Sequence, residues 1–440
     1  MTDDRYPHAH VHLGVFFQGV NHSTIWSDPA SGSQIDFETF RQVVQTAERG
    51  LFDAFFLGEG LRLREQNGVL HDLDVVGRPD AITQLAALAA VTTHIGLAAT
   101  QNVTYNDPAD LARRLASLHA LSGGRAAWNI VTTDNAWTGE NFRRGGWLHH
   151  SQRYERAGEF VEAAQAIWDG FGETISYTGS TVSLSVEPTV ALSDHPVLFQ
   201  AGDSPDGRDF AARHAEVIFS AHGTDYDDAL AFADDIRART VRAGRPVDDL
   251  KILPGTQFVL AATDEEAWEK ARWVKEQQVT PATALSLLGQ VWGEDLSSYD
   301  PDGPLPAHDP VIATVGETRG TARHGADPTA IARAWRERAE AENLSIRQLV
   351  IAQERQRGFV GSVESVADEL VRWVRGGASH GFNITPWLVP TGLDDVVDLL
   401  VPALQERGAY RDAYTSTSLR DHLGLRAPVP HRAPAALVEA

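Results

Sequence analysis

The chain has 440 residues, 42% of them hydrophobic and 22% charged, with no cysteine and a formal net charge of −22. The absence of cysteine excludes disulfides, thiolate metal sites and a cysteine nucleophile, and it favours a cytoplasmic location. The negative charge predicts repulsion of nucleic acids and of anionic membranes, so an anionic ligand needs a local binding device such as a helix N-terminus.

Buried strands and amphipathic helices alternate along the first part of the chain. The strands are apolar runs typical of a parallel sheet covered on both faces, and each helix has an apolar stripe. Strands are predicted at residues 10–19, 53–60, 94–102 and 126–131. Helices are predicted at residues 36–50, 80–93 and 107–124, with a fourth after residue 149. Phe37, Leu121 and Phe171 are expected on the buried stripes, and Asp107 followed by Pro108 predicts a capped helix start.

The alternation continues to the end of the chain. Strands are predicted at residues 195–204, 217–223, 251–263 and 381–388, and helices at residues 207–216, 225–244, 362–377 and 393–408. Eight such units predict an α/β fold, a (β/α)8 TIM barrel formed by one domain over residues 1–426. An open doubly wound sheet is the alternative, but GVFFQGVNHS (14–23) matches its glycine fingerprint poorly.

Three segments, 60–79, 134–149 and 284–326, are too long for ordinary barrel connections and are expected to be lids at the C-terminal face. Residues 427–440 are expected to form a flexible C-terminal tail. Neither a signal peptide nor a membrane span is expected, because no stretch has the required apolar core.

Polar residues stand where three predicted strands end. Glu59 ends the second strand, Thr100 and Asn102 end the third, and Thr132 follows the fourth. Such positions on a barrel rim are typical of active sites, although solvation of the rim is the alternative. Asn129 is expected deeper in the sheet and needs an internal hydrogen-bond partner.

The segment QAGDSPDGRDF (200–210) is the best candidate for binding a phosphate. Gly202 permits close backbone approach, and Asp203 and Ser204 open a helix whose first N–H groups are free. A capped turn without a ligand is the alternative. His150 and Tyr154 are four residues apart and share one face of a helix, from which they can hydrogen-bond a polar ligand such as a phosphate.

Other residues are candidates for the substrate pocket or for a metal. His22 and Trp26 follow the first strand, with plain packing as the alternative. Arg319, Arg323 and His324 form a basic patch suited to a carboxylate or sulfonate, or paired with acidic neighbours. His8, His10 and His12 have the spacing of metal-dependent barrel hydrolases, but they precede the first strand, and metal ligands belong at a strand's C-terminal end.

Three segments carry a family resemblance: GRAAWNIVTT (124–133), ENF (140–142) and HHSQRYERAGEFVEAAQAIWD (149–169). They resemble the flavin-dependent monooxygenases of the bacterial-luciferase superfamily, in the branch of nitrilotriacetate, EDTA and dibenzothiophene-sulfone monooxygenases. The resemblance extends over about residues 10–425. It implies a luciferase-like barrel that takes reduced FMN from a separate NAD(P)H:flavin reductase. With dioxygen, it would oxygenate a small organic substrate, often with C–N or C–S cleavage.

The resemblance also implies roles for particular residues. It places the phosphate at residues 202–204, Thr100 beneath the flavin ring, and Glu59 where the family generally has an aspartate. The full set expected to bind the cofactor is Glu59, Thr100, Asn102, Thr132, His150, Tyr154, Gly202, Asp203 and Ser204. Asp203 departs from the family pattern, because its charge is unfavourable beside a phosphate unless it turns away to cap the helix.

Three other functions remain open at this point. They are a luciferase-like deazaflavin-dependent oxidoreductase, a metal-dependent barrel hydrolase and a flavin-binding protein without catalysis. No nucleic-acid or membrane partner is expected, and the resemblance implies a homodimer or homotetramer. The substrate cannot be read from the sequence, because lid and pocket loops determine it.

Overall fold

The structure is a computed structural model that describes residues 4–17, 23–63, 65–66, 69–70, 78–132, 138–139, 141–142, 150–311, 327–354 and 358–428. Its core is one parallel sheet in the order β11-β10-β9-β6-β5-β2-β1-β15-β12. The strands are β1 (His12–Phe17), β2 (Ala54–Leu57), β5 (Gly96–Asn102), β6 (Ala126–Val131), β9 (Val197–Gln200), β10 (Val217–Ile218), β11 (Lys251–Ile252), β12 (Gly255–Thr256) and β15 (Gly381–Ile384).

The two edge strands of this sheet, β11 and β12, belong to one continuous segment. On one side, the Leu253 N–H donates to the Ile218 carbonyl oxygen at 2.9 Å. On the other side, the Asn383 N–H donates to the Pro254 carbonyl oxygen, also at 2.9 Å. The segment therefore bridges β10 and β15, and the sheet closes as the predicted (β/α)8 barrel.

The predicted seventh strand, 251–263, is wrong in its second half. Pro254 has no N–H for the ladder, which separates β11 from β12. After Gln257 the chain leaves the barrel, and β13 (Phe258–Ala261) pairs in parallel with β14 (Phe359–Ser362).

Helices surround the barrel in the predicted order. They are α1 (Phe37–Arg49), α2 (Ala81–Ala89), α3 (Pro108–Ser122), α5 (His150–Asp169), α6 (Pro205–His214), α7 (Tyr226–Arg242) and α12 (Val363–Gly376), then the 3-10 helix η3 (Thr391–Leu393), the π-helix η4 (Val396–Leu400) and α13 (Val401–Glu406). The predicted start of α3 is confirmed, since the Asp107 side chain accepts from the Ala109 N–H at 3.0 Å. A short 3-10 turn, η1 (Val247–Asp249), follows α7.

Three apolar residues expected in the core are exposed instead. Phe37 is 41% exposed, Leu121 78% and Phe171 56%. Phe37 is the first residue of α1, Leu121 lies in the last turn of α3, and Phe171 follows the end of α5. Helical periodicity alone overlooks that helix ends can extend past the sheet they cover.

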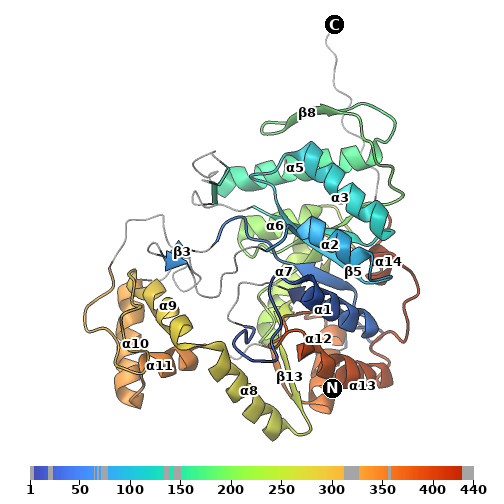
Figure 1. Cartoon of the computed structure of the whole chain (residues 1–440). Helices are drawn as coiled ribbons and strands as arrows, with labels where there is room; N and C mark the ends of the chain where they lie inside the picture. The colour runs from blue at the N-terminus through green and yellow to red at the C-terminus, as the bar shows by residue number, and fades with distance from the viewer. Residues whose placement is uncertain are drawn as a thin grey trace.

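Between β13 and β14 the chain forms a helical excursion, α8–α11, which lies to one side of the barrel in Figure 1. Its helices are α8 (Asp264–Gln278), α9 (Pro281–Trp292), α10 (Pro328–Glu342) and α11 (Ile346–Gln353). Leu288, Trp292 and Ile346 share a separate small core. The expected loop at 284–326 is therefore wrong for its first residues, which continue α9 to its C-cap at Gly293.

Two short hairpins complete the described elements, together with a helix near the C-terminus. The hairpins are β3 (Glu65–Gln66) with β4 (Val69–Leu70), inside the long 60–79 segment, and β7 (Ile175–Thr178) with β8 (Ser183–Val186) after α5. The final helix is α14 (Leu419–His422). Across the described ranges, no helix combines the length and apolar character needed to cross a bilayer.

The barrel interior is filled at its centre and closed at its N-terminal end. Phe16, Phe56, Phe199 and Phe219 stack in the middle, with ring centroids 4.8–6.0 Å apart. Below them, Leu419 of α14 packs into the same cluster, and a Cβ added at Gly96 would lie 2.6 Å from its Cδ1. A ligand can therefore reach the interior only from the C-terminal face.

Candidate active site

Polar side chains with unused hydrogen-bonding atoms lie in or just beyond five barrel strands. Among the described residues these buried atoms have no partner: Asn102 Nδ2, Asn129 Oδ1, Gln200 Oε1, Ser220 Oγ and Asn383 Oδ1. A buried polar atom left unpaired costs about 1–3 kcal/mol. Their positions in or just beyond neighbouring strands suit a polar ligand at this face.

The alternation of side chains divides these atoms into two groups. Asn102 and Asn129 share the inward face of their strands with Ala98 and Ala127, which line the interior. Asn383 also points inward, since a Cβ added at Gly14 would lie 2.8 Å from its Oδ1. Gln200 and Ser220 lie on the opposite face, towards the turn that begins α6. The inward-facing asparagines can therefore bind a ring inside the barrel mouth. Gln200 and Ser220 can bind a polar part of the ligand at the rim.

Thr100 and Asn129 form the polar floor of the mouth. They face each other across β5 and β6, and Asn129 Nδ2 donates to Thr100 Oγ1 at 3.0 Å. This confirms that Asn129 has an internal partner. Asn102 Oδ1 accepts from the N–H groups of Thr104 and Tyr105 at 2.7 and 2.9 Å, which fixes the loop after β5. Thr132 is half-buried beyond the end of β6.

Glu59 lies at the end of β2 but is turned towards α2. Its Oε2 accepts from Gln101 Nε2 at 2.6 Å, and its Oε1 lies 3.5 Å from the Ala81 N–H. Burial, followed by the charge of Asp80, raises the pKa of Glu59 to about 7. A carboxyl group at this rim therefore titrates near neutral pH and is about half protonated there.

This pKa predicts a pH-dependent stability. Because ionised Glu59 is disfavoured in the folded chain, stability falls as the pH rises from 4.5, its ordinary value, through about 7. The unfolding free energy of Glu59→Gln minus that of the wild type should therefore be larger at pH 8 than at pH 5, by on the order of 1–3 kcal/mol. Urea midpoints of the flavin-free chain at both pH values measure it, with the exposed Glu340→Gln as control. A gain independent of pH would contradict the prediction.

The turn after β9 has the geometry of an anion site. Ser204 is the N-cap of α6, its Oγ accepts from the Gly207 N–H at 3.1 Å, and Pro205 occupies the first helical position. The first N–H groups of a helix have no intrahelical acceptors, and the helix dipole favours a negative charge at this end. The predicted helix start is therefore confirmed at Ser204.

Tyr154 lies against this turn. A Cβ added at Gly207 would be 2.8 Å from the Tyr154 hydroxyl, and one added at Gly202 would be 3.0 Å from it and 2.2 Å from Gln200 Nε2. Both glycines are thus required by close approach. The fold brings Tyr154 and residues 202–204 together as expected. His150 begins α5, but its side chain lies outside the described residues.

The charge of Asp203 is held away from the turn. Its Oδ1 accepts from Arg208 Nη2 at 2.8 Å and lies 3.2 Å from His222 Nε2. Burial would raise the pKa of Asp203, but His222 and Arg208 outweigh it and lower the pKa. The carboxylate of Asp203 is thus paired with Arg208 and His222 and does not cap the helix, because Ser204 is the N-cap.

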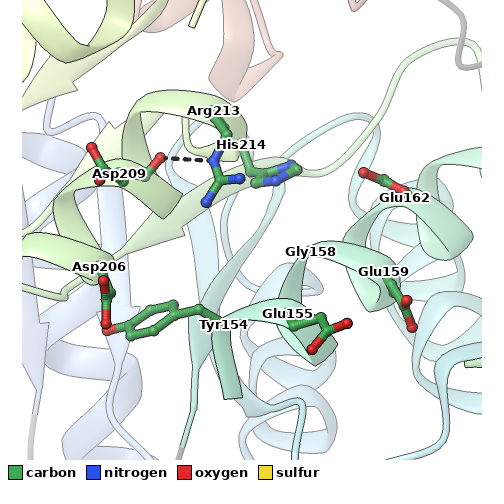
Figure 2. Close-up of a pocket in the computed structure, with 9 residues that line it drawn as sticks. All are labelled: Tyr154, Glu155, Gly158, Glu159, Glu162, Asp206, Asp209, Arg213 and His214. Carbon is green, nitrogen blue, oxygen red and sulfur yellow. Dashed lines mark hydrogen bonds between the residues drawn. The ribbon is translucent and has the colours of Figure 1, made fainter. Parts of the chain in front are cut away.

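A cavity of about 420 Å3 lies between α5 and α6, and Tyr154 is one of its lining residues (Figure 2). Its lining carries the carboxylates of Glu155, Glu159, Glu162, Asp206 and Asp209 against Arg213 and His214. Glu159 is already used by the hairpin turn, where it accepts from the Ser180 and Thr181 N–H groups. This acidic surface, which the sequence did not reveal, is unsuited to a phosphate.

The remaining candidates are only partly placed. His22, Arg319, Arg323 and His324 lie outside the described residues. Trp26 is half-buried, with its ring centroid 6.1 Å from that of Phe17, which favours packing. His12 lies at the N-terminal end of β1 beside Asp53, and within the described ranges no His, Asp or Glu group could hold a metal.

Comparisons with known proteins agree with this geometry. A model of the family described as luciferase-like monooxygenase matches residues 11–380. N-acetyl-S-(2-succino)cysteine monooxygenase of Bacillus subtilis is 36% identical over 95% of this chain and 97% of its own. Nitrilotriacetate monooxygenase component A of Aminobacter aminovorans has the same identity and coverage. A riboflavin lyase, solved with modified FMN and riboflavin, has a TM-score of 0.76 at 28% identity, covering 95% of this chain and 96% of its own.

Proposed function

This chain belongs to the luciferase-like monooxygenase family, and from that premise we propose that it is the oxygenase of a two-component system. It uses reduced FMN and dioxygen to oxygenate a small organic substrate. The observation that carries the proposal is the pairing of a polar barrel mouth with a capped helix N-terminus at its rim. No described residue of that mouth offers a covalent nucleophile with an adjacent base, which suits chemistry supplied by a cofactor.

The residues present fit FMN. Residues 202–204 and the first turn of α6 would hold the phosphate, with Tyr154 closing over Gly202 and Gly207. Gln200 and Ser220 would serve the same end, while Thr100, Asn129 and Asn102 would face the ring system. When bound, reduced FMN supplies the electrons that activate dioxygen, and one oxygen atom enters the substrate.

The chain's own contribution is binding, orientation and exclusion of water. The four stacked phenylalanines and the α14 plug keep water from the interior below the mouth. The Thr100–Asn129 bond fixes two polar side chains at the floor, so they need no reorganisation when a ligand arrives. Glu59, whose raised pKa of about 7 leaves it about half protonated at neutral pH, can hold or release a proton at the rim.

The substrate class follows from the relatives. N-acetyl-S-(2-succino)cysteine is a thioether with three carboxylates, and nitrilotriacetate is an amine with three carboxylates. We propose a small organic amine or sulfur compound, with C–N or C–S cleavage. That Arg319, Arg323 and His324 bind its anionic groups, and that His22 lines the pocket, stay predictions, as these residues lie outside the described ranges.

The reduced flavin must come from a partner. The sequence has no dinucleotide fingerprint after its first strand, which supports a separate NAD(P)H:flavin reductase as a transient partner. A cytoplasmic homodimer or homotetramer is part of the same proposal, and sedimentation of the purified chain tests the oligomeric state.

Oxygen consumption of the purified full-length chain tests the proposed function. With either tricarboxylate, we expect turnover when reduced FMN is supplied by a reductase or by chemical reduction, and none with NADH alone. Oxidation of NADH at enzymatic rates by the chain itself would contradict the two-component scheme. Turnover with reduced deazaflavin and no oxygen uptake would instead identify a hydride-transfer enzyme.

A further inference from the structure

One backbone carbonyl at the barrel mouth accepts hydrogen bonds from two glutamine side chains. The Ser23 oxygen lies 2.7 Å from Gln257 Nε2 and 2.5 Å from Gln278 Nε2. Gln278 Nε2 is also 3.3 Å from Gln257 Oε1. Ser23 and Gln257 are buried, and Gln278 is half-buried. Because a carbonyl oxygen has two lone pairs, it can accept one hydrogen bond from each of the two side-chain amides. We call this arrangement the Ser23 clamp.

The Ser23 clamp lies across the C-terminal ends of the last two barrel strands. Gln257 follows β12, and its Nε2 also approaches the carbonyl oxygen of Thr385, just past β15, at 3.2 Å. Thr24 Oγ1 donates to the Pro386 carbonyl oxygen at 2.9 Å, and the Ile25 N–H donates to the Trp387 carbonyl oxygen at 2.8 Å. Residues 23–25 are therefore fixed to the rim through which a ligand must enter.

Gln278 comes from outside the barrel. It is the last residue of α8, where the helical excursion turns into α9. This turn is held by Arg347 of α11, whose Nε donates to the Val279 carbonyl oxygen and whose Nη2 donates to that of Glu276, both at 2.8 Å. A continuous set of hydrogen bonds thus joins the excursion to residues 23–25.

We propose that Gln257 and Gln278 are positioning residues that fix the 23–25 segment at the mouth, so that the excursion sets the shape of the substrate entrance. The effect on substrate binding rests on the proposed function, whereas the fixing of residues 23–25 by the two glutamines does not. The flavin phosphate turn lies at β9 and α6, on other strands, so flavin affinity should be independent of the Ser23 clamp.

Gln278→Glu at pH 8 is the sharpest variant. It keeps the size of the side chain, but an ionised carboxylate only accepts hydrogen bonds and faces the Ser23 oxygen without a donor. The adjacent Gln277 is also half-buried, and its side chain makes no hydrogen bond to the described part of the chain, so Gln277→Glu matches the charge change. Gln257→Leu removes the other donor but risks the fold, because Gln257 is 4% exposed.

Amide hydrogen exchange of the full-length chain tests the positioning without any turnover. We expect the peptide containing Ile25 to exchange about fivefold faster in Gln278→Glu than in Gln277→Glu, the change expected for one lost hydrogen bond. Exchange in α6 should be equal in both variants. Equal exchange at Ile25 in the two variants would overturn the proposal.

Steady-state kinetics then tests the effect on substrate. With the tricarboxylate that the wild type oxidises, Gln278→Glu should raise KM about fivefold, with kcat and FMN affinity close to those of Gln277→Glu. Faster exchange with an unchanged KM would overturn the role at the entrance. If the wild type oxidises neither compound, the proposed substrate class fails, while the exchange result still decides whether the Ser23 clamp exists.

Discussion

Ser204→Ala is expected to weaken FMN binding about tenfold to a hundredfold and to leave riboflavin binding almost unchanged. Ser204 Oγ accepts from the Gly207 N–H, so its own O–H remains available to a phosphate oxygen. A charge-assisted hydrogen bond is worth about 1.5–3 kcal/mol, which gives the stated range. Because the chain carries a net charge of −22, it has no general attraction for a dianion to compensate the loss.

A second helix provides the matched control for this variant. Ser362 caps α12 in the same way, with its side chain accepting from the Ser365 N–H. Ser362→Ala therefore loses a comparable cap, about 0.5–2 kcal/mol of stability, without touching the turn at residues 202–204. Isothermal titration with FMN and riboflavin should separate the two variants. If Ser204→Ala weakened the binding of FMN and riboflavin equally, the assignment of the phosphate to residues 202–204 would be wrong.

Arg411→Ala is expected to lower the unfolding free energy by about 3–5 kcal/mol, because it leaves a buried carboxylate without its cation. Asp53 is 0% exposed at the N-terminal end of the barrel, where it accepts from Arg411 and from the Leu13 N–H. Arg411 also donates to the His422 carbonyl oxygen at 3.1 Å, so the variant loosens the segment that ends in α14. Urea unfolding of the flavin-free chain measures the loss.

The pH profile distinguishes this from a general packing defect. Burial would raise the pKa of Asp53, but Arg411 and then His12 outweigh it and hold the pKa at about 2. The Asp53 contribution is therefore present above its ordinary value of 3.8 and is lost as the pH falls through about 2. Arg113→Ala, which removes a pair whose side chains are 58% and 53% exposed, should cost little. A comparable loss in Arg113→Ala would contradict this account.

The barrel could be predicted from sequence because its signals are local. Each buried strand is an apolar run, each helix has a periodic stripe, and Asp107 with Pro108 marks a boundary within two residues. The turn at Ser204 was equally local, since a glycine, a hydroxyl and a proline appear side by side. Tyr154 was matched to that turn through helical spacing and the family resemblance.

The features that sequence reasoning missed depend on contacts between distant segments. The break after Gln257 arises because β13 pairs with β14, about a hundred residues later. The Ser23 clamp joins residues 23, 257 and 278, which are too far apart in the sequence for any local pattern to predict their contact. The orientation of Glu59 depends on Gln101 of the neighbouring strand. Only the folded chain shows which polar groups are paired and which remain for a ligand.

Labelled dioxygen tests the central claim most directly. The purified full-length chain should be given chemically reduced FMN, a tricarboxylate substrate and 18O2. The carbonyl product of the cleavage should be reduced at once to its alcohol, before its oxygen exchanges with water, and then analysed by mass spectrometry. A monooxygenase incorporates one labelled oxygen atom per product molecule, and the label should be absent when FMN is supplied oxidised. Product that forms without label, or that forms equally without oxygen, would contradict oxygenation and with it the function assigned to this barrel mouth.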